Sequence, residues 1–161
     1  MSCTKDDIEQ VQMVDAAKNG QLETLKTMLG RGVPVEAKHN FGYTALIRGA
    51  ENGHLEVERY LVEHAKANVE AKTNGGNTAL ILGAYFGHLE VVRYLVEHAK
   101  ANVEAKTNGG DTALTRGALN GHLEVVRYLV GHAKANVEAK TNGGNTALIL
   151  GAYFGHLEVV R

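Results

Sequence analysis

The sequence predicts an all-α solenoid in which short helix-turn-helix units stack side by side. The tetrapeptide Gly-His-Leu-Glu begins at Gly53, Gly87, Gly121 and Gly155, so the repeat is 34 residues long. A degenerate copy begins at Gly20. Residues 64–93 and 132–161 are identical, which places the repeat inside a 68-residue super-repeat. Self-similarity at such a period indicates an array of stacked supersecondary units.

The first element is a helix from Asp6 to Asn19 that is longer and more polar than those that follow. Asp7, Glu9 and Gln10 are available for its solvent side. Because each unit of a solenoid buries its faces only against neighbours, terminal units need a polar outer face. We therefore interpret this helix as part of an N-terminal cap.

Each later unit begins with a short apolar helix, as the one after Asn77 illustrates. The hydroxyl of Thr78 can accept a hydrogen bond from a free N–H of the first helical turn. Residues 79–86 are apolar nearly all round, so this helix must be buried between neighbours. Gly87 ends it. First helices are predicted to begin near Thr44, Thr78, Thr112 and Thr146.

A second helix follows the glycine and is predicted to begin near His54, His88, His122 and His156. In the unit of His88, an apolar stripe at helical spacing runs through Leu89, Val92, Val96 and Ala99. The chain then leaves through residues 102–106. Asn108-Gly109-Gly110 follows and is a strong signal for a tight turn, in which glycine supplies positive φ.

This pattern resembles the ankyrin repeat over essentially the whole chain. The resemblance rests on Gly-Asn-Thr-Ala-Leu, then Gly-Ala, two variable residues and Gly-His-Leu-Glu-Val-Val-Arg-Tyr-Leu-Val. It implies antiparallel helix pairs joined by β-hairpin-like fingers and stacked into a curved slab. We expect a single array over residues 1–161, with units at about 5–38, 39–72, 73–106, 107–140 and, incomplete, 141–161.

The chain departs from the family pattern where the first helix starts and where the second ends. Ala replaces the usual Pro after the capping Thr, and the usual His is replaced by Ile47, Ile81, Thr115 and Ile149. We therefore expect a helix-start hydrogen bond typical of the family to be absent. The later units have Ala-Lys-Ala-Asn, one residue longer than the family's Gly-Ala-Asp. We expect their second helices to be slightly longer.

Composition excludes several classes of partner. A formal net charge of −1 gives no electrostatic reason to bind nucleic acid or an anionic membrane. No apolar run approaches a membrane span. Cys3 is the only cysteine, so no disulfide can form within the chain. We expect an intracellular, cytoplasmic protein that has no membrane or nucleic-acid partner.

Catalysis and metal binding are not expected within these residues. The histidines recur once per unit and so form rows, whereas zinc ligands must converge on one ion. The same holds for Glu70, Glu104 and Glu138, and the lysines of the same segments are interpreted as a solvated face. Ser2 and Cys3, the candidate nucleophiles, fall in a tail. Gly-Gly-Asn-Thr lacks the Lys of a phosphate-binding loop. We predict no cofactor, no metal and no catalytic residue.

The positions that differ between units are the candidates for partner binding. By resemblance, they line the concave face formed by the first helices and the fingers, and they include aromatic residues and Arg, which dominate many interfaces. The alternatives are drift at tolerant sites, or neighbour packing for Leu82, Tyr85 and Leu119. The candidates are Phe41, Tyr43, Arg48, Glu51, Asn52, Asn77, Leu82, Tyr85, Phe86, Asp111, Arg116, Leu119, Asn120, Asn145, Leu150, Tyr153 and Phe154.

The sequence thus favours a protein-binding module or scaffold with an unidentified protein partner. One alternative is a structural segment that associates end to end through the C-terminal unit, since that unit has no following unit to cover its apolar side. Another is the targeting arm of a larger enzyme whose catalytic domain is not in this chain.

Overall fold

The computed structural model describes residues 4–161, so Ser2 and Cys3 lie outside the described residues. Within that range the chain forms helices and no β-strand beyond an isolated bridge between His39 and Tyr43. The predicted all-α solenoid is therefore confirmed. The helices are α1 Lys5–Lys18, α2 Leu22–Gly30, α3 Ala45–Asn52, α4 Leu55–Glu63, α5 Ala79–Phe86, α6 Leu89–Glu97, α7 Ala113–Leu119, α8 Leu123–Gly131, α9 Ala147–Tyr153 and α10 Leu157–Val160.

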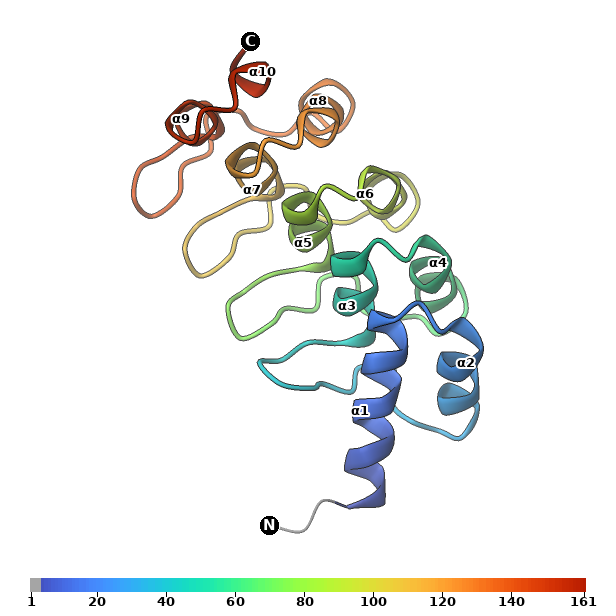
Figure 1. Ribbon diagram of the computed structural model, residues 1–161. Coiled ribbons are helices and arrows are strands. Elements are labelled where there is room, and N and C mark those ends of the chain that lie inside the picture. The colour runs from blue at the N-terminus through green and yellow to red at the C-terminus, as the bar shows by residue number, and fades with distance from the viewer. Residues whose placement is uncertain (1–3) are drawn as a thin grey trace.

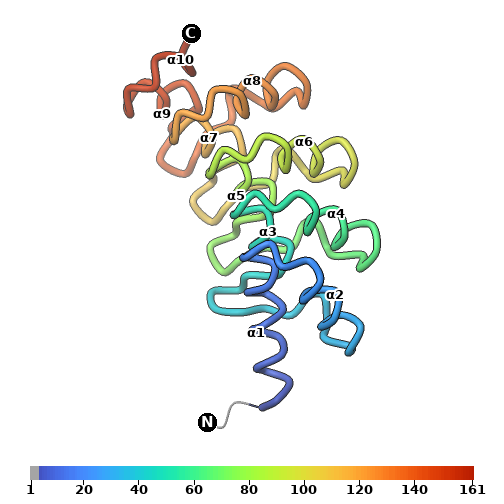
Figure 2. Tube along the Cα trace, turned by 45° about the vertical axis from the view of Figure 1, so that its right-hand side comes forward, coloured from blue at the N-terminus to red at the C-terminus, as the bar shows by residue number. Residues whose placement is uncertain are grey.

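The helices form two rows, and the chain advances by one helix pair at a time (Figure 1). We number the units one to five by their pairs, from α1–α2 to α9–α10. Each first helix packs against the second helix of its own unit and against neighbouring first helices, two for α3, α5 and α7 and one for α1 and α9. The loops before α3, α5, α7 and α9 project from the first-helix row, and we call them fingers (Figures 1 and 2).

The N-terminal helix begins with a capping box. The Thr4 hydroxyl accepts from the Asp7 N–H at 3.1 Å, and the Asp7 carboxylate accepts from the Thr4 N–H at 2.9 Å. This arrangement satisfies two of the free N–H groups at a helix start. The carboxylate also accepts the Thr4 hydroxyl proton, and these hydrogen bonds lower the pKa of Asp7.

The first helices begin and end where the local sequence chemistry predicts. Thr78 accepts from the Ile81 N–H at 3.3 Å, and Thr44, Thr112 and Thr146 act as the equivalent caps. In α5 every residue from Ala79 to Ala84 is buried. Gly87 then adopts φ +81°, a left-handed conformation that a glycine takes without steric cost, and the helix ends. The predicted starts of the second helices, one residue after each turn histidine, are also confirmed.

The helix-start hydrogen bond expected to be missing is present in unit four. The Thr115 hydroxyl accepts from the Thr112 N–H at 2.8 Å, while Thr112 accepts from the Thr115 N–H at 3.3 Å. Threonine therefore restores a reciprocal cap that isoleucine cannot make. The prediction was wrong at Thr115 because it considered only the loss of the usual histidine and not the hydroxyl that replaces it.

The prediction of longer second helices is wrong, since α2, α4, α6 and α8 each have 9 residues. The extra residue instead enlarges the turn after the helix. In that turn Lys66, Lys100 and Lys134 adopt φ between 56° and 57°. The ammonium of Lys100 donates to the Glu97 carbonyl at 2.6 Å, and Lys66 and Lys134 make the equivalent bond. A side chain thus satisfies a carbonyl that the helix leaves free.

The buried side of the second helices is also shifted from the predicted stripe. In α6 the buried residues are Val91, Val92, Tyr94 and Leu95. Leu89 and Val96 are half-buried, and Ala99 lies beyond the helix end. The helix is covered by its own first helix and by the neighbouring second helices, so more of its circumference is buried than a single stripe describes.

Candidate functional site

The surface that carries most of the candidate residues is formed by the fingers and the outward side of α3, α5, α7 and α9. We call it the finger face. Its framework is held by hydrogen bonds between successive fingers. The Asn108 N–H donates to the Gly75 carbonyl at 3.0 Å, and the Asn108 amide donates to the Asn74 carbonyl at 2.9 Å. Asn142 repeats both bonds one unit later.

The fingers pack closely enough to require glycine. A Cβ added at Gly76 would lie 2.6 Å from the side-chain oxygen of Asn108, and φ at Gly76 is +81°. Gly110 has the same conformation and the same close contact with Asn142. The positive φ predicted for the Asn-Gly-Gly turns is therefore confirmed for the second glycine, and the finger face is a rigid support.

In unit two, a charged pair lies against an aromatic ring. Arg48 and Glu51 form an ion pair at 2.6 Å. The guanidinium lies 3.7 Å from the centroid of the Tyr43 ring, within the range of a cation–π contact. The Asn52 amide donates to the Arg48 carbonyl at 2.9 Å. Three side chains thus fix the position of one arginine.

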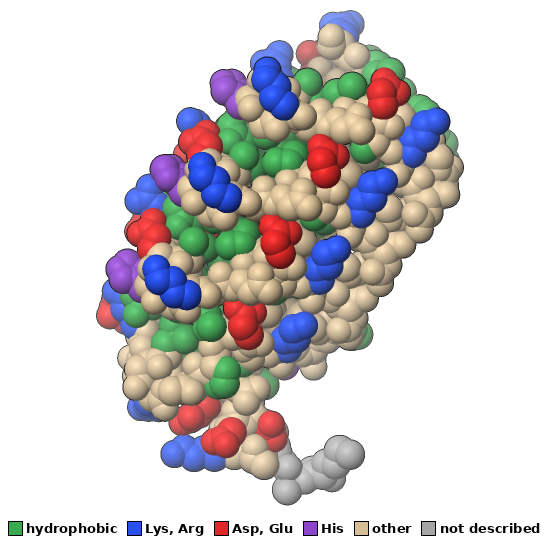
Figure 3. Space-filling view, turned by 180° about the vertical axis from the view of Figure 1, so that it is seen from behind, with side chains coloured by type: hydrophobic (Ala, Val, Ile, Leu, Met, Phe, Trp, Pro, Cys, Tyr) green, Lys and Arg blue, Asp and Glu red, His purple; other side chains and the backbone are tan. Residues whose placement is uncertain are grey.

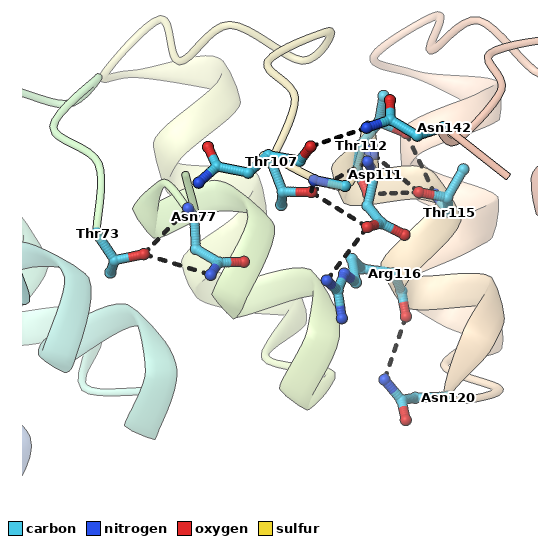
Figure 4. A network of polar contacts seen from close by, with 11 residues as sticks. Thr73, Asn77, Thr107, Asp111, Thr112, Thr115, Arg116, Asn120 and Asn142 are labelled. Atoms are coloured by element: carbon cyan, nitrogen blue, oxygen red, sulfur yellow. Dashed lines mark hydrogen bonds and ion pairs between the residues drawn. The ribbon is translucent and has the colours of Figure 1, made fainter. Parts of the chain in front are cut away.

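In unit four, a similar arrangement uses an acid from the finger (Figure 4). Arg116 and Asp111 form an ion pair at 3.2 Å, and the Thr107 hydroxyl donates to the same Asp111 oxygen at 3.1 Å. The Arg116 guanidinium lies 5.5 Å from the centroid of the Tyr85 ring on α5. Asn120 donates to the Arg116 carbonyl at 3.3 Å.

Units three and five present aromatic pairs at the end of the first helix. The Tyr85 and Phe86 rings meet edge to face at 4.9 Å, and those of Tyr153 and Phe154 do so at 5.0 Å. Phe86 is 45% exposed and Phe154 is 53% exposed. Phe41, at the tip of the first finger, is 75% exposed. Large apolar rings therefore remain on the surface of the finger face.

A family model for ankyrin repeats in three copies matches residues 13–107 and 100–161. The chain belongs to the ankyrin-repeat family. Ankyrin repeats generally act as protein–protein interaction modules. No curated protein sequence matches the chain significantly.

The ankyrin fold brings most of the predicted partner-binding residues to the finger face, with one clear exception. Leu82 is only 7% exposed and belongs to the hydrophobic core, so predicting it as a contact residue was wrong. Its equivalent Leu150 is half-buried because no further first helix covers it. Asn77, Asn145 and Leu119 are also half-buried. The Asn77 amide donates to the Thr73 hydroxyl at 3.3 Å and so helps to shape its own finger (Figure 4).

The histidines at the turns between helices connect successive ankyrin units. His88 contacts the Glu51 carbonyl and His122 the Tyr85 carbonyl, each through Nε2 at 2.9 Å. His54 and His156 make the equivalent contact. Across residues 4–161, no three His, Cys, Asp or Glu side chains gather as a metal site would require. Nor is any described helix both long and apolar enough to cross a bilayer.

The side seen from behind the array carries charged residues in rows (Figure 3). The sequence predicted a solvated face of lysines and a row of glutamates, but several of these side chains connect neighbouring units. Glu70 accepts from the Asn102 N–H at 2.7 Å, and Lys72 donates to the Lys106 carbonyl at 3.0 Å. The signal for these bonds was the strict period of 34, which places the same donor and acceptor in every unit.

The tyrosines of the second helices also connect successive ankyrin units. The Tyr94 hydroxyl donates to Glu63 at 3.2 Å, and that of Tyr128 donates to Glu97 at 3.0 Å. Burial, together with the hydrogen bond to the carboxylate, raises the pKa of each tyrosine to about 12. Both phenols are therefore neutral donors at physiological pH. Their interactions lie within the array, so they serve the framework and not the finger face.

Proposed function

We propose that this ankyrin array is a protein-binding module that holds its partner on the finger face. The observation that carries the proposal is the placement of the phenylalanines. The chain has three, and Phe41, Phe86 and Phe154 are all exposed, all on this face. Burial of a phenylalanine side chain is worth about 1.5–3 kcal/mol, so three exposed rings on one surface favour a covering partner.

The rigidity of the finger face supports the same proposal. Binding is weakened by the cost of ordering loops and side chains at the interface. Here the fingers are already joined by hydrogen bonds, and Arg48 and Arg116 are already held by their ion pairs. A partner would therefore meet a preformed surface.

The test is a comparison of partner affinity for two matched triple variants. Tyr43→Ala, Tyr85→Ala and Arg116→Ala change the finger face. Glu56→Ala, Glu90→Ala and Glu124→Ala change exposed positions on the second helices. After a partner is isolated with the unmodified chain, calorimetry should show at least a tenfold weaker affinity for the first variant only. Equal affinities for both variants, with helicity retained, would overturn the assignment of this face.

A second candidate, end-to-end association of two copies, is favoured by the outer side of unit five. Leu148 is 57% exposed and Ile149 is 47% exposed. Both line a groove of about 500 Å³ that also includes Val130 and Val137. Light scattering across a concentration series tests this candidate: a constant monomer mass up to high concentration would exclude it.

A further inference from the structure

We propose that the finger face binds an extended, uncharged segment through two equivalent aromatic pairs, Tyr85–Phe86 at the end of α5 and Tyr153–Phe154 at the end of α9. This inference rests on the proposed function and names the kind of partner. It predicts a segment with two apolar anchors six positions apart.

The two aromatic pairs are copies of one another in sequence and in geometry. Residues 73–93 and 141–161 are identical, so each pair has the same finger before it and the same turn after it. The ring centroids lie 4.9 Å apart on α5 and 5.0 Å apart on α9, with interplanar angles of 78° and 75°. The same pair of rings therefore occurs twice on the finger face, with Tyr85 half-buried and Tyr153 81% exposed.

Units two and four, which precede the two aromatic pairs, also resemble one another on the finger face. Arg48 precedes the first pair and Arg116 precedes the second. Each arginine carbonyl accepts from an asparagine four residues later, Asn52 in one unit and Asn120 in the other. The finger face is thus built as two modules, each with an arginine, an asparagine and an aromatic pair.

The distance between the modules sets the length of the segment that can contact both. Packed neighbouring helices lie about 8–10 Å apart, so two pairs on α5 and α9, with α7 between them, are separated by about 16–20 Å. An extended chain advances about 3.3 Å per residue and its side chains alternate between two faces, so two anchors on the same face lie six positions apart, at about 20 Å. A helix advances about 1.5 Å per residue and would need eleven to thirteen.

The polar groups of the face favour an uncharged and extended partner. Both arginines are neutralised by Glu51 and Asp111, so an acidic segment would have to break an existing ion pair. Asn52 and Asn120 each use an amide N–H within the chain. Their amide oxygens have no hydrogen-bond donor among the described residues and can accept from main-chain N–H groups. An extended segment has such groups free, whereas a helix uses them internally.

The experiment uses the full chain and a phage-displayed library of random 16-residue peptides. Selection on the unmodified chain is followed by counter-selection on the double variant Phe86→Ala/Phe154→Ala. Both residues are exposed, so the variant should keep its fold, which circular dichroism checks. We expect enriched peptides with two apolar or aromatic residues six positions apart. Each single variant should bind such a peptide at least tenfold more weakly, and by a similar factor.

Other outcomes overturn the inference and separate it from the proposed function. Enriched peptides with one anchor, or with anchors eleven to thirteen residues apart, would exclude an extended segment with two anchors. If these peptides nevertheless bound the Tyr43→Ala or Arg116→Ala variant more weakly than the unmodified chain, the proposed function would stand and this inference would not. Peptides that bind the double variant and the Tyr43 and Arg116 variants as tightly as the unmodified chain would overturn both the inference and the proposed function. Failure to enrich any peptide over the counter-selection would overturn the inference alone.

Discussion

His88 in unit three donates through Nε2 to the carbonyl oxygen of Glu51 in unit two, at 2.9 Å. Because a carbonyl oxygen only accepts, the proton of the neutral ring lies on Nε2. The same ring covers Gly53, where a Cβ would lie 2.6 Å from Nδ1. One histidine therefore satisfies a carbonyl near the end of the preceding first helix and fills the space above the glycine that ends it.

Gly87→Ala should destabilise the array more than Gly155→Ala. At Gly87 the new Cβ would lie 2.5 Å from Nδ1 of His122, and φ is +81°. At Gly155 φ is +78°, but no atom lies within 4 Å. Both substitutions incur about 1–2 kcal/mol for a left-handed residue, and only Gly87→Ala also displaces a histidine. Urea denaturation measures the difference.

The double variant Gly87→Ala/His122→Ala provides the control for this comparison. Removing the ring removes the steric conflict, so the two substitutions should be less damaging together than the sum of their separate effects. Equal losses of stability for Gly87→Ala and Gly155→Ala, or strict additivity in the double variant, would show that the histidine does not constrain the glycine.

Glu58→Val should stabilise the chain at neutral pH. Glu58 is fully buried, and neither carboxylate oxygen has a hydrogen-bond partner. The equivalent residues Val92 and Val126 are apolar. An unsatisfied buried polar group costs about 1–3 kcal/mol, which sets the expected gain in the free energy of unfolding. Thermal unfolding of Glu58→Val and of the exposed control Glu56→Val checks it.

The same carboxyl predicts how stability depends on pH. Burial raises the pKa of Glu58 in the folded chain well above 4.5, its ordinary value. The unfolded chain therefore loses this proton at lower pH than the folded chain. Proton binding at Glu58 therefore contributes to the free energy of unfolding. This contribution is fully present below the unfolded-state pKa and is lost as pH rises through the folded-state pKa.

Glu58→Gln isolates that dependence, since it keeps a buried polar side chain that cannot titrate. The difference in melting temperature between Glu58→Gln and the unmodified chain should grow as pH rises from 4 to 8. A difference in melting temperature that stays constant from pH 4 to pH 8 would show that folding does not shift the pKa of Glu58 within this range.

The sequence predicted the helix boundaries because local chemistry determines them. Thr78 caps α5 and Gly87 ends it, and both residues act on the backbone of their own helix. Burial of Glu58 could also have been predicted by comparing units, since valine occupies the same position in the later ones. The positions predicted from differences between units lie in the first helices and fingers, so the glutamate that replaces valine on α4 was not among them.

The finger face was predicted less well, because exposure there depends on contacts between units. Leu82 is buried by its neighbours although the equivalent positions of adjacent units carry Arg48 and Arg116. A position that differs between units can therefore differ because of its contacts with neighbouring units and not because it contacts a partner. The ion pairs of these arginines likewise depend on side-chain conformations that spacing alone does not determine.

Lys100→Val should destabilise the chain more than Lys100→Asn does, since both variants lose the hydrogen bond to the Glu97 carbonyl and differ in how well they tolerate the backbone conformation. Lys100 has φ +57°, which a β-branched residue adopts only at a cost, whereas asparagine tolerates this conformation. We expect the valine variant to be about 1–2 kcal/mol less stable than the asparagine variant. Lys140→Val, at the exposed position equivalent to Lys106 in the next unit, is the control for side-chain propensity. Equal stability of the Lys100 variants in urea denaturation would argue against the left-handed turn.

Hydrogen exchange should be faster in α9 than in α5, although residues 79–86 and 147–154 have the same sequence. Identical sequences have the same intrinsic exchange rates, so any difference reports local stability alone. First helix α5 lies between α3 and α7, whereas α9 packs on α7 with no first helix on its other side. Stability in a solenoid is a sum over neighbouring units, so α9 should open more often. Mass spectrometry of dilute protein measures this. Equal protection in dilute monomer would contradict the nearest-neighbour account, and protection of α9 that rises with concentration would reveal association through unit five.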